Sequence, residues 1–172
     1  HNSKGGSRPS VLNMSLGDMP SSGYPYVYFN DPNSVSDDYL DDMVDACANA
    51  GITVVISAGN GFDNGDETNY VFHGRMNSRF IRPARTENVI TVGALNPDSS
   101  IAYYSNYGQN VDVFAPGSDI YSALNTDASM ITVMSGTSMA APIVSGMCAL
   151  YLQGDPTAAP MKVRSNIISK CS

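Results

Sequence analysis

The chain has 172 residues, of which 42% are hydrophobic and 15% are charged, a balance typical of one compact globular domain rather than a disordered segment. Its formal net charge of −7 argues against a nucleic acid or an anionic membrane surface as a partner, and no apolar run has transmembrane length. The low Lys content, together with abundant Tyr, Asn, Ser and Gly, favours a secreted protein, with a vacuolar or lysosomal location as the alternative.

The first part of the chain contains a predicted strand and an amphipathic helix. Residues 11–17 follow a polar, Gly-rich opening and predict a strand that ends at a glycine. A long loop is expected over 18–35. Apolar residues then recur at helical spacing from Leu40 to Cys47, and Gly51 ends this run.

The middle of the chain contains the remaining strand patterns. The continuous β-branched run over 52–56 predicts a strand buried on both faces. Residues 62–87 are irregular and polar. Further strands are expected over 89–94 and 111–117, and a hairpin over 120–134.

Two helices are expected near the end of the chain. One follows Ser138 and presents Val144, Met147, Cys148 and Tyr151 to the core, and the other begins near Pro160. A strand, a helix and a buried strand in succession indicate a βαβ unit. The expected fold class is therefore α/β, with a mostly parallel sheet flanked by helices.

The stretch 135–142 places a hydroxyl between small residues where a turn leads into a helix. Gly136 allows a tight turn, and the start of a helix offers unpaired N–H groups and a positive dipole end that favour an oxyanion. Ser138 is therefore a candidate nucleophile, although Thr137 or Ser138 is equally typical of a helix N-cap.

Two strand ends carry further groups that acyl transfer at a serine needs. The amide of Asn60 and the backbone N–H of Ser138 are candidate oxyanion donors, although Asn followed by Gly is also typical of a turn. The extended residues Ser15, Leu16 and Gly17 could pair with a peptide as an added strand, or simply end a strand.

Six sequence blocks follow one another along nearly the whole chain. They are Val-Leu-Asn-Met-Ser-Leu-Gly (11–17), Val-Val-Ile-Ser-Ala-Gly-Asn (54–60), Val-Ile-Thr-Val-Gly-Ala (89–94), Tyr-Ser-Asn-Tyr-Gly (104–108), Val-Asp-Val-Phe-Ala-Pro-Gly (111–117) and Ser-Gly-Thr-Ser-Met-Ala-Ala-Pro (135–142). In this order and approximate spacing they resemble the later part of a subtilisin-like serine protease, nearest the proteinase K branch. The resemblance implies that 1–172 is the C-terminal part of one subtilisin-like catalytic domain and lacks the N-terminal strands of its sheet.

The resemblance also implies an activity and a set of site residues. The activity is that of a serine endopeptidase with Ser138 as nucleophile and Asn60 as oxyanion donor, and no cofactor is required. By the same resemblance, Ser15, Leu16 and Gly17 form one wall of the cleft for the main chain of a polypeptide substrate. Ser57, Ala58 and Gly59 line the pocket for the side chain before the cleaved bond. A propeptide or a protein inhibitor is a further expected partner.

A structural calcium ion is a further implication of the resemblance. Its ligands would be the carbonyl oxygens of Glu87 and Val89 and the carboxylate of Asp112. Hard oxygen ligands suit calcium, but a structural hydrogen-bonding role for Asp112 explains the residue equally well.

The base and the carboxylate that orients it do not appear in this pattern. The resemblance places an Asp and a His, each in a sequence block of its own, before the 11–17 strand. Neither the Asp block nor the His-Gly-Thr block of the family occurs in the sequence. The two histidines are His1, which is terminal, and His73, which is expected to be exposed and inert in a polar loop. We therefore expect an N-terminal partner chain or segment to carry both residues; the alternatives are an inactive fragment and a peptide-binding or inhibitory module.

The three cysteines, Cys47, Cys148 and Cys171, cannot all pair with one another. Cys47 and Cys148 lie on apolar helix faces, which favours small buried side chains. The odd number also allows a bridge to a segment outside this sequence.

Overall fold

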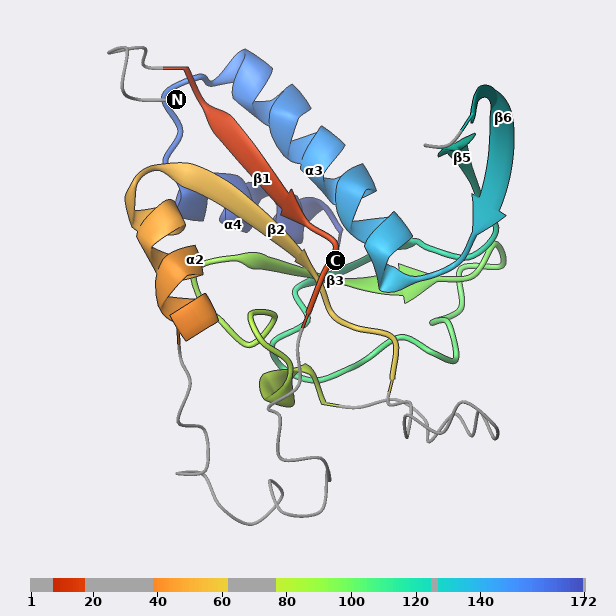
Figure 1. Ribbon diagram of the computed structural model, residues 1–172. Coiled ribbons are helices and arrows are strands. Elements are labelled where there is room, and N and C mark those ends of the chain that lie inside the picture. Colours follow the sequence, from red (N-terminus) through yellow and green to blue (C-terminus); the bar gives the residue numbers. More distant parts are fainter. Residues whose placement is uncertain (1–7, 18–38, 62–76, 125–126, 172) are drawn as a thin grey trace.

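The computed structural model describes residues 8–17, 39–61, 77–124 and 127–171, and all structural statements below concern those residues (Figure 1). The loop predicted over 18–35, most of the irregular segment 62–87, and both histidines lie outside them.

Four parallel strands form the sheet, in the order β1-β2-β3-β4. They are β1 (Ser10–Met14), β2 (Ile52–Ser57), β3 (Ile90–Leu95) and β4 (Val113–Pro116). β1 and β2 pair from Ser10 opposite Ile52 to Met14 opposite Ile56. Because parallel strands end at the same edge, the segments that follow β1 and β2 lie side by side there.

Helices cover both faces of this sheet (Figure 1). They are α2 (Tyr39–Asn49) on one face and α3 (Thr137–Gly154) with α4 (Pro160–Lys170) on the other. A short 3-10 helix, η2 (Ser78–Phe80), precedes β3. None of the helices in the described ranges is long and apolar enough to cross a membrane.

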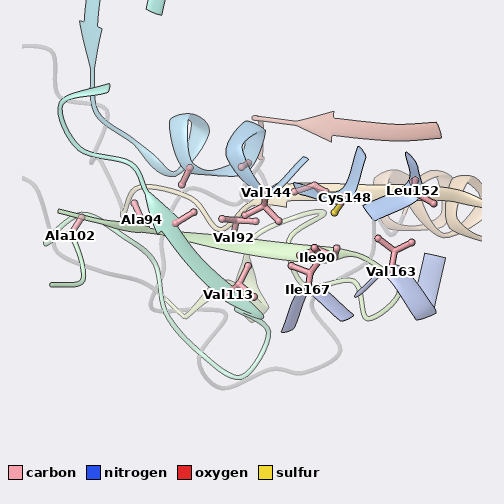
Figure 2. Close-up of a cluster of buried hydrophobic side chains, with 14 of the residues drawn as sticks. Ile90, Val92, Ala94, Ala102, Val113, Val144, Cys148, Leu152, Val163 and Ile167 are labelled. Atoms are coloured by element: carbon pink, nitrogen blue, oxygen red, sulfur yellow. The ribbon is translucent and has the colours of Figure 1, made fainter. Parts of the chain in front are cut away.

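The larger part of the core lies between the sheet and α3 with α4, as Figure 2 shows. Val55 and Val144 belong to this part, whereas Val54 and Ile56 pack with Val44 of α2 on the opposite face. Successive residues of a strand point to opposite faces, so a strand covered on both sides is apolar throughout. This explains why 52–56 is a continuous β-branched run.

The antiparallel hairpin of β5 (Ile120–Leu124) and β6 (Asp127–Met134) stands apart from the main sheet (Figure 1). Ile120 lies opposite Met134, and the register shifts next to Leu124. Several of its large apolar side chains are exposed, among them Tyr121 and Ile131.

The fold class is confirmed, with differences at the ends and faces of elements. The strand predicted over 11–17 ends at Met14, because residues 15–17 are exposed and leave the sheet. Met147, which was expected in the core, is 36% exposed. The buried line of α3 instead follows Val144, Cys148 and Leu152 at intervals of four residues, a narrower stripe than the pattern predicted.

The three cysteines lie in different environments, and all are free thiols in this structure. Cys148 is completely buried in the core, Cys47 is half-buried, and Cys171 is exposed just after α4. Burial raises the pKa of the Cys148 thiol to about 11.

We expect Cys148 to resist a thiol reagent in the folded protein while Cys171 reacts quickly. The reactive form is the thiolate, and at pH 8, three units below the pKa, only about 0.1% of Cys148 is ionised. Mass spectrometry after brief treatment with a disulfide reagent measures both sites. Cys171→Ser should remove the fast reaction, and rapid modification of Cys148 without denaturant would contradict the prediction.

Candidate active site

A pocket of about 190 Å³ lies where the ends of β1 and β2 meet the start of α3. Its lining comes from five separate segments of the chain and consists of Leu16, Gly17, Ser57, Gly59, Asn60, Gly61, Ile81, Asn106, Thr137 and Ser138. The structure therefore brings Asn60 and Ser138, which are far apart in the sequence, to one place.

The side chain of Asn60 is held in one orientation by Thr137. Its Oδ1 accepts a hydrogen bond of 2.8 Å from the backbone N–H of Thr137 and another of 2.8 Å from the Thr137 hydroxyl. A backbone N–H can only donate, so the carbonyl end of the Asn60 amide must face it. The Nδ2 end keeps its hydrogens for other acceptors.

Thr137 also joins the end of β2 to α3. Its side chain is buried, and its hydroxyl oxygen accepts a bond of 3.1 Å from the N–H of Gly59. The sequence offered Thr137 or Ser138 as an N-cap. In the structure the N-cap is Gly136, whose N–H donates to the Gly117 carbonyl at 2.8 Å.

Asn106 holds the segment 58–61, which follows β2, by side-chain hydrogen bonds, a role that the sequence did not reveal. Its buried side chain donates to the Ala58 carbonyl at 2.9 Å and accepts from the Gly61 N–H at 3.0 Å. Gly59 has a φ of 93°, and a Cβ there would lie 2.5 Å from Asn106 Nδ2. Only glycine fits this position. The single signal for Asn106 was its place in the 104–108 block.

The end of β1 contacts the residue that carries the candidate nucleophile. Pro142 lies inside α3 and has no N–H, so the carbonyl of Ser138 lacks its usual helical donor. The hydroxyl of Ser15 donates to this carbonyl at 2.8 Å. Asn13 donates to Ser15 at 3.0 Å and accepts from Ser145 at 2.9 Å, which closes a network between β1 and α3.

Four of the six predicted substrate-binding residues line the pocket. Leu16, Gly17, Ser57 and Gly59 line it. Ser15 lies beside it on the Ser138 carbonyl, and Ala58 is completely buried, so its side chain does not face the pocket. Roles in substrate binding remain predictions for all six residues.

Two of the three predicted calcium ligands, Val89 and Asp112, bind the guanidinium of Arg164 instead. Arg164 donates to the Val89 carbonyl at 2.9 Å and forms an ion pair with Asp112, while the Glu87 side chain is exposed. The described ranges contain no group of three or more His, Cys, Asp or Glu residues that could hold a metal ion. With Arg164 in this position, Val89 and Asp112 do not fit a calcium ion.

Comparison with known proteins identifies the family of the chain. Residues 4–171 match the Subtilase family. An extracellular serine proteinase of a Thermus species is 41% identical over 161 residues, which are 94% of this chain and 32% of that protein. A cuticle-degrading serine protease of Arthrobotrys oligospora is 36% identical over 165 residues, or 93% of this chain and 33% of that protein.

A solved structure shows that the fold is also similar to that of a subtilisin-like proteinase. The crystal structure of a cold adapted subtilisin-like serine proteinase superposes with a TM-score of 0.73 at 31% identity, covering 94% of this chain and 48% of that one. The chain thus spans about a third of the length of the two curated relatives above and about half of this structure.

Replacing Thr137 by the isosteric valine should destabilise the protein. The change leaves the Gly59 N–H without its acceptor and removes one of the two bonds to Asn60, so we expect a loss of roughly 1–3 kcal/mol in the free energy of unfolding. Urea denaturation measures it. Thr157→Val is the matched control, because that exposed hydroxyl makes a local bond to Asp155, two residues away. Equal stability of the two variants would show that Thr137 does not join the loop to α3.

Proposed function

The chain belongs to the subtilase family, and we propose that it forms the nucleophile-bearing part of a serine endopeptidase. The observation that carries the proposal is the orientation of Asn60, whose Oδ1 is bound twice by Thr137 immediately before Ser138. This arrangement supports a role for Nδ2 as a donor next to the Ser138 hydroxyl, in a pocket that contains both residues.

In the proposed reaction the Ser138 oxygen attacks the carbonyl carbon of a peptide bond. Asn60 Nδ2 and the Ser138 N–H donate to the oxygen that becomes negative, and the N-terminal end of α3 adds its positive potential. The C–N bond then breaks, the proton of the serine hydroxyl passes through a base to the leaving amine, and an acyl-enzyme remains. Water hydrolyses this ester and restores the hydroxyl.

The substrate in this proposal binds as an added strand along the backbone of residues 15–17, which leave the sheet and are exposed. The pocket of about 190 Å³ is smaller than those that enclose drug-sized ligands and suits one side chain, the one before the cleaved bond. A propeptide or a protein inhibitor would bind along the same backbone.

The base and its carboxylate come, in this proposal, from a His and an Asp on a partner chain or segment N-terminal to this one. Two features support such a partner. Within the described ranges β1 pairs only with β2, so its other edge has unused backbone groups. α3 also exposes Ile143, Met147 and Leu150 on one face. The name of the Thermus relative supports secretion.

The second candidate is a peptide-binding or inhibitory module without catalytic activity, or an inactive fragment. It is favoured by one observation, namely that the described residues lining the pocket include neither a histidine nor a carboxylate. Both candidates require the same cleft and differ in whether Ser138 is activated.

Covalent labelling separates the two candidates. A fluorophosphonate should phosphonylate Ser138 in the intact protein, because an activated serine attacks phosphorus as it attacks a carbonyl, and Ser138→Ala should abolish the label. Asn60→Leu should slow labelling by about 10²–10³; this range was measured in a subtilisin for loss of one oxyanion donor and serves here as the reference value. Peptide binding without any labelling would favour the module.

Ser15→Ala should lower kcat roughly three- to tenfold with little change in KM, as expected for the loss of one hydrogen bond of about 1 kcal/mol. The backbone that would pair with substrate is kept, but the Ser138 carbonyl loses its donor. Peptide hydrolysis by the intact protein measures both constants. Ser165→Ala is the control, since that exposed hydroxyl bonds only to a carbonyl of its own helix among the described residues. An unchanged kcat in Ser15→Ala would exclude a positioning role for this side chain.

A further inference from the structure

Arg164 connects the last helix, α4, to the residues just before β3 and β4. Its Nε donates to the Val89 carbonyl at 2.9 Å, and its Nη2 pairs with Asp112 Oδ1. The side chain of Asp112 is only 7% exposed and that of Arg164 is 26% exposed. The second oxygen of Asp112 accepts the backbone N–H of Thr91 at 2.9 Å. The two acceptors of the guanidinium among the described residues are thus oxygens from different parts of the chain.

These acceptors are the kind that a calcium ion uses. A carboxylate and main-chain carbonyls are hard oxygen ligands, and calcium needs six to eight of them including water. A guanidinium and a metal ion compete for the same lone pairs, so both cannot occupy the space between Val89 and Asp112. One carboxylate balances the single charge of Arg164 but not the double charge of calcium.

A cation is needed at this place whatever its origin. The side chain of Asp112 is almost fully buried, with one oxygen bound to the Thr91 N–H and the other paired with Arg164. Removing the ionised carboxylate from water costs free energy, and a positive charge beside it offsets that cost. Because Arg164 lies on α4 between the buried residues Val163 and Ile167, the same contact fixes the helix to β3.

We propose that the Arg164 guanidinium takes the place of a calcium ion between the Val89 carbonyl and the Asp112 carboxylate, so that this contact is independent of metal. The chain supplies its own cation, covalently attached and permanently charged. Removal of Arg164 would leave the buried Asp112 carboxylate and the Val89 carbonyl oxygen without this donor, and calcium could then bind them.

Thermal melting of the intact protein in EGTA and in millimolar calcium tests the proposal. The difference in Tm between wild type and Asp112→Asn should be the same in both conditions. Arg164→Gln keeps the length of the side chain but not its charge. It should melt roughly 5–10 °C lower in EGTA and regain several degrees in calcium, a gain that Asp112→Asn in the same protein should abolish.

Lys162→Gln is the matched control on the same helix, because Lys162 is exposed and its one ion pair with a described residue is with Asp155. It should shift Tm by no more than about 1–2 °C and gain no calcium response. The proposal is overturned if calcium stabilises wild type through Asp112, or if Arg164→Gln folds and does not respond to calcium.

If Arg164→Gln does not fold, luminescence of terbium, used as a calcium substitute, decides on the folded proteins. Terbium binding by wild type that Asp112→Asn removes would overturn the proposal. Binding that is equal in the two proteins supports it.

Discussion

The arrangement of the site depends on the two hydrogen bonds between Asn60 and Thr137. Backbone groups at a strand end have left the ladder and must find other partners when they are buried. The end of β2 finds them on two sides, in the Thr137 hydroxyl and in the side chain of Asn106. Asn60 cannot rotate without breaking two bonds to Thr137. The pocket is thus shaped by hydrogen bonds that form only when the sheet and α3 are in place.

The start of α3 is held in a second, independent way. Pro142 removes one helical hydrogen bond, and the carbonyl that it frees accepts the Ser15 hydroxyl from β1. Ser138 therefore lies between two fixed points, one at the end of β2 and one at the end of β1. A site whose side chains are fixed by secondary structure loses little order when a substrate binds. The network surrounds Ser138, the proposed nucleophile.

Local patterns predicted the elements well, because their signals are local. The β-branched run 52–56 and the hairpin over 120–134 depend on neighbouring residues, and the structure contains both. Ser138 and Asn60 could be singled out because small residues surround them in the sequence. Arg164 could not, since its partners Val89 and Asp112 are 75 and 52 positions away, and a charged residue on a short helix predicts a solvated face. Thr137 and Asn106 were missed for the same reason: their roles exist only through tertiary contacts.

If the base comes from a partner as proposed, this division of the site has a chemical consequence. Oxyanion donors and a shaped cleft favour the transition state even where the base is absent, and in serine proteases they retain part of the rate enhancement when triad members are removed. The groups around Asn60 and Ser138 would therefore bind an extended peptide near the reactive geometry with or without a histidine. Peptide affinity reports on the cleft alone, while the reactivity of the Ser138 oxygen reports on the base. A binding module could evolve from this cleft by loss of the base, with no change in the hydrogen bonds that hold Asn60.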